Sequence, residues 1–152
     1  MKYRIRTLDK NDFSKNYLNL MSQLSPVDIK KVTKLEFVSW VDEVKNNSCH
    51  NIFVIENVDN ADIIASGTLL IEPKLIHSFG YVGHIEDIIV DKSYRGCGLG
   101  KIIVSYLIEH AKILKCYKVI LNCSDKYVKF YKKLGLNKKD NTMSNVIIVY
   151  KI

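Results

Sequence analysis

Three glycines within five residues separate an apolar stretch from an amphipathic helix in the second half of the chain. Residues 94–112 read YRGCGLGKIIVSYLIEHAK, with glycines at positions 96, 98 and 100. Glycine is costly to order, so such a density indicates a backbone that turns sharply or is approached closely. A helix start usually carries one capping side chain instead. This feature constrains the fold most, because it demands a strand, a tight turn and a helix in that order.

The glycine stretch is suited to binding a diphosphate. A helix N-terminus leaves about four backbone N–H groups without partners and carries a partial positive charge. Glycines remove obstructing side chains, and Arg95 and Lys101 add charge. A Walker loop is excluded because Ile102 follows Lys101, and the spacing is not the GxGxxG of Rossmann folds. The alternative is a flexible turn that binds nothing.

The first half of the chain predicts a strand and two helices. Residues 3–8 alternate like an edge strand. Asn11 or Asp12 is expected to cap a helix that Ser25 and Pro26 break. A second helix is predicted over about residues 33–44. Its buried face is expected to consist of Leu35, Val38 and Val41.

The remaining pattern predicts a mixed sheet in one domain. Residues 51–56 and 63–72 form a probable hairpin, and an apolar strand over 84–91 precedes the glycines. After the glycine helix come a strand at 116–123, a helix opened by Ser124 or Asp125 and closed near Gly135, and a last strand at 143–151. The order predicts an α+β fold. A length of 152 residues suits a single domain, residues 1–152.

Composition bounds the environment and the partners. The net charge of +7 attracts anions, but Lys is spread along the chain instead of forming the block typical of nucleic-acid readers, so no nucleic acid is expected. No apolar run approaches the roughly 18 residues of a membrane span. No spacing suggests a metal site. Four cysteines without a CxxC pair favour reduced thiols and a cytoplasmic location: Cys49, Cys97, Cys116 and Cys123.

Longer stretches carry a family resemblance. Arg95, Gly98 and Gly100 match the R/Q-x-x-G-x-G/A motif of the GNAT superfamily of N-acetyltransferases, and FYKKLGL follows at residues 130–136. GHIEDIIV, CYKVILNC and VKFYKKLG further resemble eukaryotic glucosamine 6-phosphate N-acetyltransferases. The resemblance implies a mostly antiparallel sheet with a splayed parallel pair, flanked by helices. It also implies a homodimer that transfers acetyl from acetyl-CoA to the 2-amino group of glucosamine 6-phosphate, in UDP-N-acetylglucosamine biosynthesis.

The resemblance implies where acetyl-CoA would bind. The glycine-loop amides would hold the pyrophosphate, the strand before them would pair with the pantetheine arm, and a tyrosine hydroxyl would lie near the sulfur. Cys97 is interpreted as a variable loop position without a nucleophilic role. The residues implied are Ile88, Ile89, Val90, Arg95, Gly96, Cys97, Gly98, Leu99, Gly100, Lys101 and Tyr131.

Catalysis is expected from Glu86, Asp87 and Tyr131. The two carboxylates interrupt an apolar strand, where unpaired buried charge is expensive, and the resemblance places them at the sugar and its amine. Adjacent residues of a regular strand face opposite sides, so a bulge or splay is predicted there. Ion-paired or solvated carboxylates are the alternative. For Tyr131 the alternative is a core aromatic beside Phe130 and Leu134.

Substrate contacts are implied in several segments. Relatives carry an acid where this chain has Asn122, which motivates another acceptor: a protein lysine, a polyamine or another small amine. A non-catalytic acyl-CoA or nucleic-acid module is a third hypothesis. An ordinary surface role is the alternative for the lysines and the histidine. The implied substrate residues are Ser25, Lys74, Leu75, Ile76, His77, Glu86, Asp87, Tyr117, Lys118 and Asn122.

Overall fold

The computed structural model describes residues 2–25, 28–140 and 142–144. It divides into two compact units, residues 1–121 and 122–152. The predicted last strand at 143–151 lies outside the described residues, apart from its first two positions. A single domain over residues 1–152 therefore stays a prediction.

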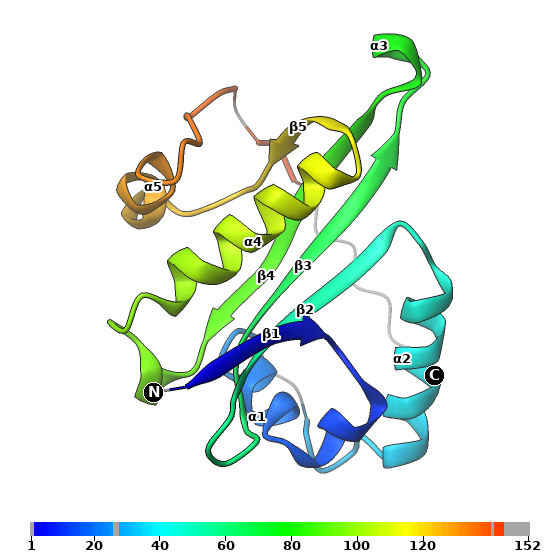
Figure 1. Ribbon diagram of the computed structural model, residues 1–152, viewed down its shortest axis with the longest axis vertical. Coiled ribbons are helices and arrows are strands. Elements are labelled where there is room, and N and C mark those ends of the chain that lie inside the picture. The colour runs from blue at the N-terminus through cyan, green and yellow to red at the C-terminus, as the bar shows by residue number, and fades with distance from the viewer. Residues whose placement is uncertain (1, 26–27, 141, 145–152) are drawn as a thin grey trace. The chain divides into compact units, whose positions relative to one another are not determined.

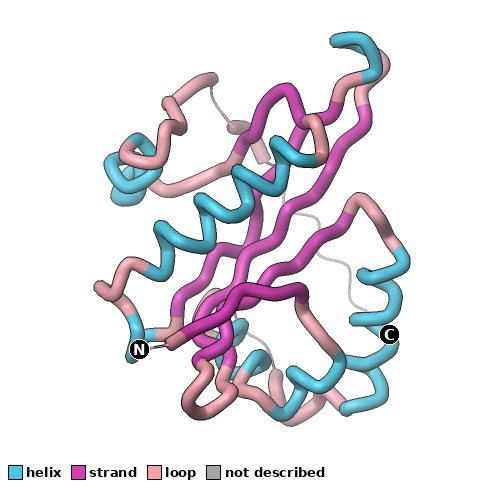
Figure 2. Tube along the Cα trace, in the orientation of Figure 1, coloured by secondary structure: helices cyan, strands magenta, loops and turns pink. Residues whose placement is uncertain are grey.

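The first unit contains a five-stranded mixed sheet (Figures 1 and 2). Its strands lie in chain order: β1 (Tyr3–Thr7), β2 (His50–Asn57), β3 (Ile63–Pro73), β4 (Tyr81–Val90) and β5 (Cys116–Ile120). Neighbours are antiparallel except β4 and β5, which are parallel. The helix α4 (Leu99–Ile113) makes the crossover between these two. The predicted α+β fold with one parallel pair is confirmed.

Helices cover the two faces of the sheet. Strand side chains alternate between the two faces, so adjacent residues of β2 show what covers each face. Phe53 makes an edge-to-face contact with Tyr106 of α4, with ring centroids 4.9 Å apart. Ile52 and Val54 instead join the core with Tyr17. The helices of this second face are η1 (Lys10–Ser14), α1 (Tyr17–Ser22) and α2 (Lys34–Asn46).

The first predicted helix begins one turn earlier than expected and is split. Asp9, not Asn11 or Asp12, is the N-cap, because its side chain accepts the Asn11 N–H. Asp12 is fully buried and pairs with Arg6, Nη2 to Oδ1 at 2.7 Å, while its other oxygen accepts the Asp9 N–H at 2.8 Å. Asn16, with φ of 66°, then separates η1 from α1. The predicted caps were wrong, because Asp12 is the third helical residue and closes a capping box with Asp9 while it pairs with Arg6 of β1.

The helix α2 begins with a complete capping box. The Thr33 hydroxyl accepts the Glu36 N–H, and the Glu36 carboxylate accepts the Thr33 N–H at 2.8 Å. The inward face is marked by Phe37, whose ring lies 5.6 Å from that of Phe13 and 5.9 Å from that of Tyr17. Leu35 is 79% exposed and Val38 only half-buried, so the predicted stripe was wrong at both positions. The buried residues are Phe37, Val41 and Val44.

The second unit contains the helix α5 (Asp125–Lys132). Ser124 occupies its N-cap position, as predicted. The Gly135 N–H bonds the Lys132 carbonyl at 3.1 Å, and Gly135 has a φ of 86°, a conformation that ends helices. The boundaries of this helix were thus predictable from local residues alone.

Candidate active site

A bulge interrupts β4 at the two adjacent carboxylates. On β4 two residues, Asp87 and Ile88, lie between Glu86 and Ile89, whereas β3 places only Gly67 between the partners of those two. Asp87 has a φ of 52°, in the left-handed region that non-glycine residues rarely adopt. The predicted bulge is confirmed. It changes the direction of the side chains from this point along the strand.

The two carboxylates of the bulge differ in exposure. Glu86 is half-buried and Asp87 is exposed. Within residues 2–25 and 28–121, no lysine, arginine or histidine lies within ion-pair distance of either. Burial raises the pKa of Tyr17 to about 12, against the lowering effect of a hydrogen bond to Ser66. The negative charge of Asp87 also raises this pKa. Among the described residues of this unit, neither carboxylate is neutralised by an ion pair, so both can bind a substrate or accept a proton.

Beyond His84, the edge of β4 that faces β5 has no pairing with that strand. The parallel ladder runs from Tyr81, opposite Cys116, to His84, opposite Ile120, where β5 ends. Residues 85–90 continue past it and, except at the bulge, remain paired with β3 on the other side (Figure 1). Among residues 2–25 and 28–121, no strand covers this margin. A ligand with amide groups could bond to it as a strand would.

The glycine loop follows β4 directly. Arg95 folds back, its Nε donating to the Val90 carbonyl at 3.2 Å. Gly96 and Gly98 have φ of 83° and 82°, and a Cβ on either would meet no atom of the protein within 4 Å. Backbone conformation, not crowding, therefore selects glycine here. The predicted tight turn between strand and helix is present.

The N-terminus of α4 is not closed by a side chain. Its N-cap, Gly98, makes no side-chain cap bond, and the Ile102 N–H is the one that bonds the Gly98 carbonyl, at 3.1 Å. The N–H groups of the first turn, from Leu99 to Lys101, thus precede the helical ladder. Arg95 and Lys101 are both exposed beside them. The arrangement can bind an anionic group such as a diphosphate.

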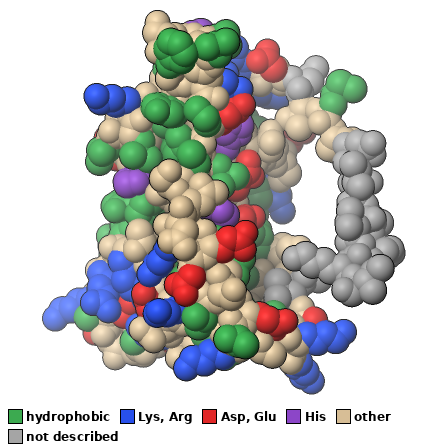
Figure 3. Space-filling view, turned by 90° about the vertical axis from the view of Figure 1, so that its right-hand side faces the viewer, with side chains coloured by type: hydrophobic (Ala, Val, Ile, Leu, Met, Phe, Trp, Pro, Cys, Tyr) green, Lys and Arg blue, Asp and Glu red, His purple; other side chains and the backbone are tan. Residues whose placement is uncertain are grey.

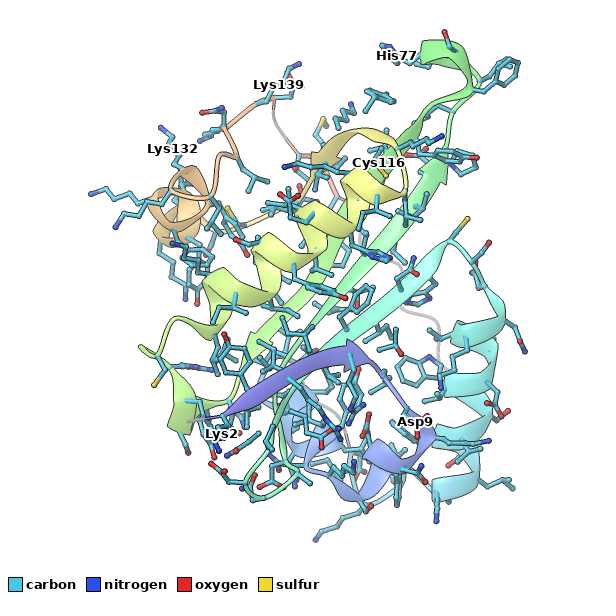
Figure 4. All side chains as sticks on the ribbon, viewed as in Figure 1. Lys2, Asp9, His77, Cys116, Lys132 and Lys139 are labelled. Atoms are coloured by element: carbon cyan, nitrogen blue, oxygen red, sulfur yellow. The ribbon has the colours of Figure 1, made fainter. Side chains whose placement is uncertain are left out.

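Several predicted substrate residues gather at the tip of the β3–β4 hairpin. This tip carries α3 (Ile76–Phe79), where Figure 4 labels His77. The His77 ring lies 4.3 Å from that of Tyr117, and the Lys118 ammonium is 5.7 Å from the same ring. Lys74 is paired with Glu72. Leu75 and Ile76 are strongly exposed.

The hairpin tip is distant from the bulge within one chain. Tyr81 begins β4 beside the tip, and Glu86 follows five residues later, about 17 Å along an extended strand. The structure thus does not bring Leu75, Ile76 or His77 to the carboxylates of the same chain. Ser25 is exposed just after α1. The substrate roles of these residues stay predictions.

The second unit holds the remaining predicted residues. Tyr131 is half-buried, with the Phe130 ring 5.0 Å from its own. Burial, and then the neighbouring Cys123, raise the pKa of Tyr131, so its hydroxyl is protonated at neutral pH and can donate. The Asn122 side-chain oxygen accepts a hydrogen bond from the Thr142 hydroxyl at 2.8 Å.

Two surface hollows lie elsewhere. One of about 270 Å³ opens between α1 and α2 and is lined mainly by apolar side chains, and one of about 350 Å³ lies between α2 and β2. Neither includes the bulge or the glycine loop, and neither gathers convergent groups suited to acyl transfer. Among the described residues, no cluster of three or more His, Cys, Asp or Glu could hold a metal ion. No described helix is both long and apolar enough to cross a membrane.

Comparison with known proteins agrees with this geometry. Residues 13–136 match the model of the acetyltransferase (GNAT) family. The chain belongs to the GNAT family. The glucosamine 6-phosphate N-acetyltransferase of Arabidopsis thaliana is 39% identical over 143 residues, covering 93% of this chain and 95% of the relative. That of Candida albicans is 39% identical over 134 residues, covering 88% of each chain.

The solved structure of the Arabidopsis thaliana enzyme is similar to this GNAT chain throughout. The TM-score is 0.92 at 38% identity, over 97% of this chain and 100% of the other. The predicted family, fold and activity class, an N-acetyltransferase, are confirmed. The GNAT family match runs across both compact units.

Proposed function

We propose that the chain is a glucosamine 6-phosphate N-acetyltransferase. It transfers the acetyl group of acetyl-CoA to the 2-amino group of the sugar phosphate, giving N-acetylglucosamine 6-phosphate and CoA. The supporting observation is the bulge at Glu86 and Asp87, which leads along an open strand margin to an uncapped helix N-terminus. The similarity to enzymes of that name over most of both chains supports this acceptor.

The described residues fit acetyl-CoA. The first-turn amides of α4, with Arg95 and Lys101, would hold its diphosphate, since no cap side chain competes there. The β4 margin at residues 85–90 would pair with its pantetheine amides. When bound, acetyl-CoA supplies the activated acetyl thioester. The protein supplies the alignment of that thioester with an amine, which lowers the entropic part of the barrier.

Different side chains carry out the two proton transfers of the reaction, one from the amine and one to the thiolate. The acceptor nitrogen must lose a proton, and Glu86 or a water held by it takes that proton. Asp87 holds the sugar. Tyr131, which keeps its proton at neutral pH, donates to the departing thiolate. Asn122 orients the sugar by hydrogen bonds but cannot accept a full proton.

We further propose a homodimer in which the hairpin tip serves the partner's site. The tip exposes Leu75, Ile76 and Phe79 at 79%, 63% and 73%. Figure 3 shows apolar side chains at its top, the end of the molecule where α3 lies in Figure 1. Apolar side chains clustered this way favour burial against another protein surface. His77 and Tyr117 would then approach a sugar that they cannot reach in their own chain. A cytoplasmic location is proposed because all four cysteines are free.

A thiol-release assay tests the proposed function. Purified protein, acetyl-CoA and glucosamine 6-phosphate should yield free CoA and the N-acetylated sugar phosphate, identified by mass spectrometry. Tyr131→Phe should lower kcat by about 10-fold or more and change the acetyl-CoA KM little, as expected of a proton donor. Silence between pH 6 and pH 9 would exclude the proposed acceptor.

A competing acceptor is motivated by Asn122, because its amide cannot accept a full proton at neutral pH. The same assay should therefore include glucosamine, a lysine peptide and a polyamine as rival acceptors. We expect the sugar phosphate to give the highest kcat/KM. A higher value for any rival would reassign the acceptor while leaving acetyl transfer intact.

A further inference from the structure

One side chain ties the end of α1 to the segment that opens the glycine loop. The Gln23 Nε2 donates to Asp91 Oδ2 at 2.9 Å, and the Lys92 N–H donates to Gln23 Oε1 at 3.0 Å. These bonds require the amide in one orientation, because only its nitrogen can donate to the carboxylate and only its oxygen can accept from an N–H. Glutamine is thus matched to both contacts at once.

Asp91 is the fixed point of this tie. It is buried, and its carboxylate also accepts the Ser93 N–H at 2.8 Å, which caps η2 (Lys92–Tyr94). Burial raises its pKa, but hydrogen bonds from Gln23 and Ser93, and one from the Asn16 side chain, more than offset it, so the pKa lies below its usual range.

The hydrogen bonds of Gln23 connect α1 to the glycine loop, and α1 also packs on the strand pair that carries the bulge. From Lys92 the chain runs through Arg95 to Gly98, the N-cap of α4. At its other end α1 buries Tyr17 in a core cluster that includes Ile63 of β3 and Ile89 of β4, the residue just after the bulge. The helix α1 is therefore fastened both to the strand pair that carries the carboxylates and to the loop suited to a diphosphate.

We propose that Gln23 is a positioning residue for the coenzyme. By holding Asp91 and the Lys92 amide, it fixes the start of the 91–98 segment and so the direction of the glycine-loop amides. It touches neither substrate nor reacting atoms. This inference rests on the proposed acetyl-CoA site. It assigns the role to a residue that no motif marks, 68 positions away from its partner.

The test compares two acetyl donors that differ in the diphosphate. Acetyl-CoA needs the glycine-loop amides, whereas S-acetylpantetheine lacks the phosphates. Gln23→Ala should raise the KM for acetyl-CoA about five- to tenfold, the size of losing one ordinary hydrogen bond. Its kcat/KM with S-acetylpantetheine should stay within about twofold. Equal losses with both donors, or no loss with either, would overturn the positioning role.

Two further variants keep the result interpretable. Ser22→Ala removes a hydroxyl that bonds only the Asn19 carbonyl, at 2.8 Å, on the same helix, and should leave both donors unaffected. Gln23→Glu keeps the acceptor for the Lys92 N–H but places a like charge against Asp91, so its effect should equal or exceed that of Gln23→Ala.

Calorimetric titration with CoA separates this inference from the proposed function. If the wild-type protein binds CoA but does not acetylate glucosamine 6-phosphate, the acceptor is wrong, and a five- to tenfold weaker Kd in Gln23→Ala still supports the positioning role. An unchanged Kd in that variant would refute it. A wild-type protein that binds no CoA would refute both.

Discussion

The two long helices of the first unit begin in opposite ways. The helix α2 starts with Thr33 and Glu36, which satisfy each other's N–H groups. The helix α4 starts with Gly98 in a left-handed conformation and no side-chain cap. In α2, side chains of the helix itself bond the free N–H groups of the first turn, whereas in α4 no side chain does so and these N–H groups can bond another partner. The difference shows that a helix start can be built for stability or for binding.

Replacing Gly98 by valine should have the largest effect. The β-branched side chain would project over the amides, and a φ of 82° disfavours it by about 1–2 kcal/mol. We expect kcat/KM for acetyl-CoA to fall by about 100-fold, equivalent to about 2.7 kcal/mol. Steady-state kinetics and calorimetric titration with CoA measure it. A variant that binds CoA normally would show that the loop is not the diphosphate site.

Replacing Gly98 by asparagine separates obstruction from strain. Asparagine tolerates the left-handed region, so the melting temperature should stay near that of the wild type. Its side chain still occupies the space over the amides, and we expect the acetyl-CoA KM to rise by about tenfold. Thermal melts run beside the kinetics distinguish the two causes. Normal kinetics in this variant with poor kinetics in the valine variant would make strain the sole explanation.

Removing the cap of α2 should affect stability alone. Thr33→Ala leaves the Glu36 N–H without its acceptor and should cost about 1 kcal/mol of unfolding free energy. Urea denaturation measures the loss, with Ser39→Ala on the same helix as the control. The acetyl-CoA KM should not change. A kinetic defect would mean that α2, too, takes part in binding.

The cap of α2 should also titrate. Hydrogen bonds from the Thr33 hydroxyl and then the Thr33 N–H lower the pKa of Glu36. A carboxyl with a lowered folded pKa stabilises above its unfolded value, about 4.3, and loses that contribution as the pH falls through the folded pKa. The stability gap between wild type and Thr33→Ala should therefore be full at pH 7 and shrink below about pH 4. A constant gap would leave the Glu36 carboxylate without a role.

Local pattern predicted much of this molecule. The glycine loop and the helix after it were predictable because glycine density and a 3.6-residue period act over a few neighbours. The bulge was predictable because two adjacent charges cannot share one face of a regular strand. The same reasoning failed where a distant residue intervened. Asp12 pairs with Arg6 of β1, and the packing of Phe37 against rings of η1 and α1 turns Leu35 outward.

Other features lay beyond sequence reasoning. Gln23 and Asp91 carry no periodic or motif signal, and their contact depends on how α1 crosses the sheet. The roles of Tyr131 and Asn122 depend on where the second unit lies, which the sequence pattern does not specify. In the proposed homodimer, the role of the hairpin tip would likewise depend on a partner chain.

The margin of β4 at residues 85–90 also bears on handling of the protein. Among residues 2–25 and 28–121 no strand pairs with this margin, and an unpaired row of strand amides is a template on which another polypeptide can add itself and precipitate. A ligand lying along that row would shield it. Preparations stripped of coenzyme should therefore cloud at lower temperature than loaded ones, so that metabolite supply would govern solubility as well as turnover.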